Sequence, residues 1–214
     1  MSFAPCSGVI AGYDPGGNGC HGLAVAEFQA GACTGFAVET LANAEAVITR
    51  LESADGLAAV GIDTLASWAT GPSGWRPADL WLRERYKPIQ ASIVSPNGLY
   101  GSMALSGMGV IHALRQSSPS IQVVETHPKV LYWACAGRKY DYAGSGSQMD
   151  ADLSEWLGAD VSTRNDHEWD AALSVLAALR GVQREWQHDL FTESRPYTGR
   201  LLFPAGPVHY WWPE

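Results

Sequence analysis

The sequence predicts a mixed α/β fold, a five-stranded sheet whose first three strands are antiparallel, with helices on both faces. Three apolar runs open the chain, at residues 7–14, 21–29 and 34–41, and only short turns separate them. Consecutive strands joined by short turns pair in an antiparallel manner. Two further apolar runs, residues 56–63 and 121–126, are each preceded by a segment with helical spacing, which is typical of strand-helix alternation.

Helical patterns fill the intervals between the strands. Apolar residues recur at helical spacing over residues 42–53, and further helices are expected at 77–86, at 106–116 and from Pro128 onward. The pattern is most regular over residues 165–181, where a polar cap and two acids mark the start and a glycine marks the end. These helices supply the layers that a mixed sheet needs on its two faces.

The length suits one domain, residues 1–214, with 46% hydrophobic and 17% charged residues. Within it, residues 64–104 are rich in Gly, Pro, Ser and Trp and are expected to form an insertion or lid. Residues 138–150 are expected to be a polar loop. The last two apolar runs, residues 200–204 and 208–213, are expected to pair as an edge hairpin.

Charge and hydropathy limit the class of protein. Fourteen basic residues against 22 acidic ones give a net charge of −8, which argues against holding nucleic acid chiefly through bulk positive charge. No stretch approaches the ~20 apolar residues that span a bilayer, and the first residues do not have the pattern of a signal peptide. We therefore expect a cytoplasmic protein without a membrane segment.

Three of the apolar strands end in an acid, at Asp14, Asp63 and Glu125. The carboxyl ends of parallel strands line the crevice in which ligands bind. An acid beside a low-dielectric core is costly unless it is paired with cations. One such residue is common as a turn-former or a helix cap, but three in one chain indicate a shared site.

The helix expected over residues 165–181 adds two more acids, Asp166 and Asp170, which lie four positions apart on one face. Asp166 has an ordinary explanation, the stabilisation of the positive helix end. Asp170 lies too deep in the helix to cap it, and an almost wholly apolar run follows it. We expect Asp170 to join the strand-end acids, with Asp166 as an auxiliary.

Clustered carboxylates select hard cations such as Mg²⁺ or Mn²⁺. Two such ions about 4 Å apart clamp the attacking and leaving oxygens of a phosphodiester in an in-line displacement. Asp14, expected at the centre of the sheet, is the natural bridge between them. Without metal the acids repel one another, and some are expected to have raised pKa values.

Four motifs, in this order, resemble domain-of-unknown-function family 429, which is akin to RuvC-type resolvases. They are Gly12-Tyr13-Asp14-Pro15-Gly16-Gly17, Ile62-Asp63, Val124-Glu125-Thr126-His127-Pro128 and Asp166-His167-Glu168-Trp169-Asp170-Ala171-Ala172. Together they cover most of residues 7–181. The resemblance implies a ribonuclease H-like fold and a metal-dependent nuclease that acts on nucleic acid. The sequence departs from the family's commoner Ile-Asp-Ala-Pro by having Thr64-Leu65 after Asp63.

The resemblance also implies roles for individual residues. The implied metal ligands and catalytic acids are Asp14, Asp63, Glu125 and Asp170, with Asp166 as an auxiliary ligand. His127, from the Glu-x-His-Pro motif, is implied to orient Glu125 or a water molecule.

Contacts with substrate are expected from the insertion and from the first turn. The residues in question are Arg76, Arg83 and Trp75 in the insertion and Gly16, Gly17 and Asn18 in the turn. The two arginines would meet phosphates, and the tryptophan would offer a stacking surface. The backbone N–H groups of the turn would approach a phosphate.

Two other functions remain open on the sequence. Actin-like nucleotide-binding and phosphotransfer domains share this sheet topology and also begin with an Asp-x-Gly-Gly turn, although they normally repeat the domain. A non-catalytic binding or scaffold domain would keep the acids as a silent cluster. The acidic net charge and the aromatic tail Tyr210-Trp211-Trp212, expected to be exposed, would then favour a protein partner or a homodimer.

Overall fold

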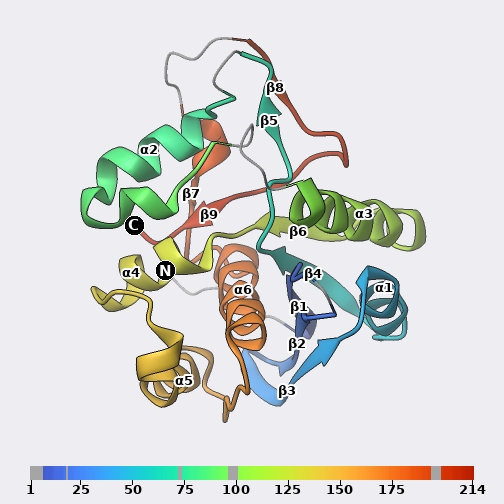
Figure 1. Ribbon diagram of the computed structural model, residues 1–214. Coiled ribbons are helices and arrows are strands. Elements are labelled where there is room, and N and C mark those ends of the chain that lie inside the picture. Colours follow the sequence, from blue (N-terminus) through green and yellow to red (C-terminus); the bar gives the residue numbers. More distant parts are fainter. Residues whose placement is uncertain (1–6, 18, 72–73, 96–100, 194–198) are drawn as a thin grey trace.

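The centre of the molecule is a five-stranded sheet in the order β3-β2-β1-β4-β6 (Figure 1). The computed structural model describes residues 7–17, 19–71, 74–95, 101–193 and 199–214. The strands are β1 (Gly8–Asp14), β2 (His21–Gln29), β3 (Ala32–Leu41), β4 (Leu57–Ile62) and β6 (Gln122–Glu125). The first three are antiparallel to one another, whereas β4 is parallel to both β1 and β6. The fold is therefore the mixed five-stranded sheet, with its first three strands antiparallel, that the sequence predicts.

Helices cover both faces of this sheet, as predicted. They are α1 (Ala44–Glu52), α2 (Pro77–Arg85), α3 (Gly101–Ser117), α4 (Pro128–Ala136), α5 (Tyr142–Leu157) and α6 (Asp166–Val182). Figure 1 shows α6 across one face and α1 and α3 on the other. In the part of the chain that is described, no helix is long and apolar enough to cross a membrane.

Alternation along the strands divides the apolar residues between two cores. Ile10 in β1 and Val124 in β6 pack in the core beneath α6. Tyr13 and Ile62 pack in the core beneath α1 and α3. Successive side chains of a strand point to opposite faces, so both cores draw on the same strands. Because both faces are covered, the strands read in the sequence as continuous apolar runs.

Glycines allow α6 to lie directly on the sheet. A Cβ atom on Gly12 would stand 1.9 Å from the Ala171 carbonyl oxygen, and one on Gly61 would stand 2.1 Å from that of Ser174. Real side-chain atoms do not approach so closely, so only glycine allows the helix backbone to rest on β1 and β4 here. The position of α6 relative to these two strands is thereby fixed.

Helix α5 occupies part of the segment that was expected to be a loop. The polar loop expected over residues 138–150 is wrong in part, because α5 begins at Tyr142 with the Asp141 side chain accepting a hydrogen bond from the Gly144 N–H. Buried Met149 and Leu153 hold this Gly- and Ser-rich helix against the core. Tertiary packing here overrides a composition that favours turns.

The edge hairpin expected in the tail is also wrong. Strand β8 (Leu201–Leu202) pairs with β5 (Trp68–Ala69) from the predicted insertion, and β9 (Trp211–Trp212) pairs with β7 (His188–Asp189). The aromatic tail is not the exposed surface that the sequence suggested, because Tyr210 is 1% exposed and Trp212 is fully buried. Burial of these large rings determines where the tail lies.

Between β8 and β9 the tail also runs along the edge strand β6. The Glu125 N–H donates to the His209 carbonyl at 2.8 Å, and the His209 N–H donates to the Val123 carbonyl at 2.9 Å. A parallel bridge joins Val124 to His209. The tail thus covers the backbone groups that an edge strand would otherwise leave unpaired.

Candidate metal centre

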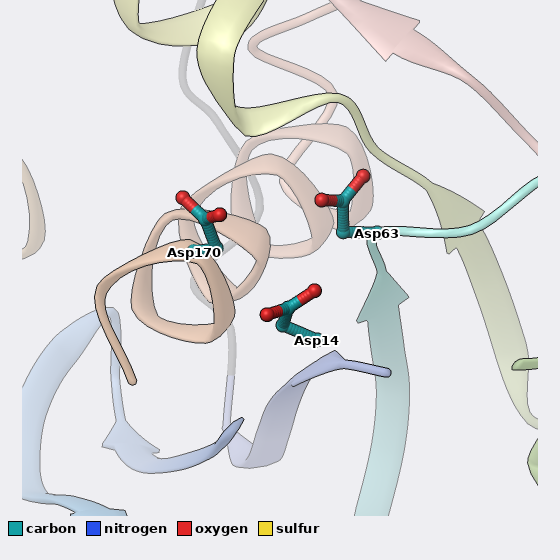
Figure 2. A group of neighbouring side chains, drawn as sticks. All are labelled: Asp14, Asp63 and Asp170. Carbon is teal, nitrogen blue, oxygen red and sulfur yellow. The ribbon is translucent and has the colours of Figure 1, made fainter. Parts of the chain in front are cut away.

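Three aspartates from three different elements meet beside the sheet. Asp14 ends β1, Asp63 follows β4 directly, and Asp170 lies on α6 (Figure 2). One carboxylate oxygen from each lies within 4.8 Å of the others. Figure 2 shows the three side chains around one common space. The geometry therefore brings together three of the five acids that the sequence singled out.

Strand geometry explains why Asp14 and Asp63 face α6. Tyr13 pairs with Ile62 across the parallel β1 and β4, and the Asp63 N–H donates to the Tyr13 carbonyl at 2.9 Å. Tyr13 and Ile62 both point to the core beneath α1 and α3. The residue after each must point the other way, toward α6 and Asp170.

Burial and mutual repulsion shape the electrostatics of the three aspartates. Asp14 is 4% exposed and Asp170 is 7% exposed. Burial, followed by the charges of Asp14 and Asp170, raises the pKa of the Asp63 carboxyl well above its usual range. Burial and the charge of Asp14 do the same to the pKa of Asp170, and burial also raises the pKa of Asp14. Without a cation, each of the three carboxylates opposes the ionisation of the other two.

One carboxylate oxygen in this group lacks a well-formed hydrogen bond. Asp170 Oδ1 is buried, and none of the described residues donates to it with good geometry. The buried Tyr140 hydroxyl is its neighbour: it lowers the Asp170 pKa as a hydrogen-bond donor, and Asp170 adds to the rise that burial causes in the Tyr140 pKa. Buried polar atoms are nearly always paired, and this carboxylate oxygen retains the capacity to bind a cation. An all-carboxylate donor set suits Mg²⁺ or Mn²⁺.

The sequence reasoning missed His167. Its Nδ1 lies 2.5 Å from Asp14 Oδ2, and this hydrogen bond is the main cause of a raised His167 pKa. His167 precedes Asp170 by three positions on α6, a spacing at which helical side chains are neighbours. The His-x-x-Asp pattern was the signal in the sequence that could have identified it.

Glu125 is not part of this carboxylate group. Its Oε1 lies 2.7 Å from Arg76 Nη2, and its Oε2 accepts hydrogen bonds from Arg76 Nη1 at 3.0 Å and from the Ala66 N–H at 2.9 Å. Arg76 also pairs with Asp79, at 2.7 Å. The charge of Glu125 is thus compensated by an internal arginine, while it still adds to the raised pKa of Asp63.

The alternation that brings Asp14 and Asp63 together separates Glu125 from them. Glu125 pairs in register with Ile62, which points away from α6, and its neighbour Thr126 bonds to Ser174 on α6. Laterally paired residues share a face of the sheet. The Glu125 side chain therefore leaves the sheet on the opposite face from that of Asp63, and there it pairs with Arg76.

The two arginines expected to contact substrate are both engaged within the protein. Arg76 is 1% exposed and is held by Asp79 and Glu125, so it is not available to a phosphate. Arg83 donates to the carbonyls of Gln90 and Ile93. Its guanidinium lies 5.0 Å above the ring of the half-buried Trp75.

The first turn lies next to Asp14. The Gly16 N–H donates to the Asp14 carbonyl, and a Cβ on Gly16 would stand 1.8 Å from the Cys20 carbonyl oxygen. Gly17 is exposed, with open space around it. Asn18, expected to approach a phosphate, lies outside the described residues.

Two charged side chains border the three aspartates. Asp166 is exposed, one turn before Asp170, and its charge adds to the raised pKa of Asp14. Lys129, at the start of α4, is exposed and lowers the pKa of all three carboxyls, although burial has the larger effect. The sequence reasoning did not single out Lys129, which is the cation that faces the cluster from α4.

A cavity of about 350 Å³ adjoins the cluster at Asp63. Its wall includes Asp63, Glu125, His127 and Lys129. The His127 ring bonds through Nε2 to the Ser92 carbonyl at 3.1 Å, whereas the hydrogen bonds of Glu125 go to Arg76 and Ala66. Burial lowers the pKa of His127 to about 4, so the ring is neutral at pH 7.

The comparisons with known proteins agree with the motifs. The family described as "Protein of unknown function (DUF429)" matches residues 12–190, which confirms the resemblance. No curated protein matches the chain.

Two solved structures from Thermus thermophilus are similar to the chain. The one described as "Thermus thermophilus RuvC structure" has 17% identity and a TM-score of 0.42 over 81% of this chain and 95% of that chain. The other, RuvC in complex with Holliday junction substrate, has 17% identity and a TM-score of 0.45 over 81% of this chain and 94% of that chain. At such identity the likeness concerns the fold alone.

Proposed function

The chain belongs to the DUF429 family, and we propose that it is a metal-dependent phosphodiesterase acting on nucleic acid, with its metal held by Asp14, Asp63 and Asp170. The observation that carries this proposal is the convergence of three carboxylates, of which Asp14 and Asp170 are buried and Asp63 is half-buried. Such a group is unstable as three anions and is stabilised by a hard divalent cation.

The chemistry follows from the donor set. Bound Mg²⁺ or Mn²⁺, held by Asp14, Asp63 and Asp170, would supply Lewis-acid stabilisation and an activated water for phosphodiester hydrolysis. The hydrogen bond from His167 Nδ1 orients the Asp14 carboxylate. Second partners of this kind hold a ligating carboxylate in position.

The charges around the site support a substrate that carries phosphate. Lys129 is exposed beside the three aspartates, and it stands in place of the engaged Arg76 and Arg83 as the cation to which we assign phosphate contact. The net charge of −8 limits binding through bulk electrostatics. Affinity would then depend on contacts at the site itself.

Calorimetric titration with Mn²⁺ tests the proposal. We expect the wild type to bind Mn²⁺ at millimolar concentration or tighter, and we expect Asp14→Asn and Asp170→Asn to lose the binding because each removes a ligand charge. Asp160→Asn changes an exposed carboxylate outside the cluster and is the matched control. If the wild type ignores divalent ions, the proposal is wrong.

Cleavage of single-stranded, duplex and branched nucleic acids by the same proteins tests the reaction. Metal-dependent cleavage that both variants lose is the expected result. Mn²⁺ binding without cleavage of any of these substrates would contradict the phosphodiesterase and leave two alternatives. Stabilisation by ATP with Mg²⁺, read as a thermal shift, would indicate a nucleotide-binding protein, and its absence would indicate a non-catalytic domain.

A further inference from the structure

The cavity next to Asp63 is distinct in character from the metal centre that it adjoins. Asp63 belongs to both, so a phosphate bound at the three aspartates would lie at the cavity's border. The cavity's volume of about 350 Å³ lies near the lower end of the ~300–1,000 Å³ found for ligand pockets. This volume suits one small ring system and cannot admit a double helix.

The walls of the cavity are mainly apolar. Leu65 lines it from the segment after β4, Ile93 and Val94 from the segment after α2, and Met103 and Ala104 from α3. Val94 is 36% exposed, and Met103 and Ala104 are half-buried, so apolar surface faces the space. Apolar walls of this kind, with a methionine that adapts its shape, suit the flat face of an aromatic ring.

Polar residues also line the cavity, and the hydrogen-bonding character of His127 is fixed by its partner. The Ser92 carbonyl can only accept, so His127 Nε2 carries the proton and Nδ1 is left as an acceptor. Lys129 lines the same cavity and is exposed, which provides a positive charge for a phosphate beside it. Arg76, also in the wall, is held by both Asp79 and Glu125, so these three side chains are engaged with one another.

We propose that this cavity holds one nucleobase of the substrate, so that the enzyme acts on a nucleotide whose base is unpaired. A paired base lies within the helical stack and cannot enter a pocket until it is extruded. An unpaired base can enter while the phosphate attached to its sugar reaches the metal centre. The inference rests on the proposed phosphodiesterase and specifies its substrate class.

Ligands that differ only in the base test this assignment. We would measure the binding of AMP, CMP and ribose 5-phosphate to the wild type in Mn²⁺; the last compound has the phosphate and sugar without the base. The two nucleotides are expected to bind about tenfold more tightly or better, from burial of one aromatic ring. Equal affinities for all three compounds would overturn the proposal.

Two substitutions on α3 locate the effect. Ala104→Phe fills the cavity. It is expected to bring the ratio of nucleotide affinity to ribose 5-phosphate affinity close to one, while the affinities for Mn²⁺ and ribose 5-phosphate stay unchanged. Leu105→Phe adds a ring at a neighbouring position that is 69% exposed, and it should keep the ratio. A ratio that survives Ala104→Phe would also overturn the proposal. If Ala104→Phe fails to fold, the wild-type comparison decides alone.

The failure of this inference can be told from the failure of the proposed function. Adenosine and cytidine, which carry no phosphate, would be titrated without metal. Nucleoside binding that Ala104→Phe removes, in a protein that ignores Mn²⁺, would retain the base pocket and reject the phosphodiesterase. A different outcome is Mn²⁺-dependent cleavage of duplex and single strand at equal rates, with AMP and CMP bound no more tightly than ribose 5-phosphate. This outcome would support the phosphodiesterase function and contradict the base pocket.

Discussion

Asp170 connects the longest buried helix to the two strand-end acids. It lies on α6, is 7% exposed, and has the buried Tyr140 hydroxyl as a hydrogen-bonding neighbour. Burial and the nearby Asp14 hold its pKa well above the usual range. Asparagine in its place would keep the shape of the side chain and remove a carboxyl whose ionisation the folded state opposes.

Asp170→Asn is therefore expected to stabilise the metal-free protein at pH 7, by about 1–3 kcal/mol in the free energy of unfolding. A carboxyl with a raised pKa holds its proton in the folded state at pH values where the unfolded chain has lost it. Wild-type stability should therefore fall as the pH rises from about 4 toward neutrality, and the variant should show a shallower fall.

Urea denaturation in EDTA across this pH range measures the effect. Asp160→Asn, at an exposed position outside the cluster, should follow the wild type at every pH. A variant that is less stable than the wild type at pH 7, or a wild type whose stability rises over this range, would show that the three carboxylates do not oppose one another.

The sequence identified the individual acids but not the side chains that pair with them. Asp14 and Asp63, singled out as strand-end acids, and Asp170, singled out as too deep in its helix for capping, lie close together. Glu125 satisfied the same strand-end criterion, yet Arg76 pairs with it. The difference lies in the phase of side-chain alternation, which a strand buried on both faces does not reveal. Nothing in the sequence distinguishes a buried arginine from an exposed one.

Among the elements, α6 determines the geometry of the site because it rests on β1 and β4 at glycines. Gly12 and Gly61 leave no room for a Cβ between strand and helix. Gly12 contacts the backbone of α6 at Ala171, which is next to Asp170 in the chain. Any displacement of α6 would therefore move one carboxylate relative to the other two.

Gly12→Ala is expected to lower the free energy of unfolding by about 1–3 kcal/mol, because the added methyl group meets the Ala171 carbonyl. Mn²⁺ affinity should fall at the same time by about tenfold or more, since a site displaced by a fraction of an ångström coordinates poorly. Calorimetric titration and denaturation of one preparation measure both effects.

Gly109→Ala is the matched control for this change. Gly109 lies in α3 with open space around it, so alanine should be neutral or should stabilise by up to about 1 kcal/mol. Unchanged Mn²⁺ affinity in Gly12→Ala would mean that the helix position does not determine the metal site.

Sequence patterns located the strands well, and the helix of residues 165–181 within a residue, but they failed where tertiary contacts decide. α5 contains glycines and serines that favour turns, and its buried Met149 and Leu153 keep it helical. The tail strands β8 and β9 are only two residues long, and each pairs with a segment distant in the sequence. Local patterns carry no information about such partners.

At the scale of the whole molecule, the tail joins the segment around α2 to the central sheet. Trp212 is fully buried, and its Nε1–H donates to the Tyr86 hydroxyl, directly after α2, at 2.8 Å. The preceding residues bond to β6. One short stretch of chain thus holds the cavity wall formed by α2 and its following residues against the metal centre.

Trp212→Ala is expected to cost about 3–5 kcal/mol in the free energy of unfolding, the usual range for truncation of a buried aromatic ring. Trp68→Ala removes the same ring from a position that is 36% exposed and should cost less than about 1 kcal/mol. Denaturation midpoints of the two variants compare these costs. Equal losses would mean that the tail does not depend on the buried ring.

The coverage of β6 by His209 also sets an order for events during synthesis. The residues of β6 are synthesised well before His209, whose backbone covers the edge of this strand. Until His209 has docked, a nascent chain that has formed its sheet presents an uncovered strand edge, which other nascent chains can extend. Misassembly through this edge is therefore open to the chain until its last residues have docked.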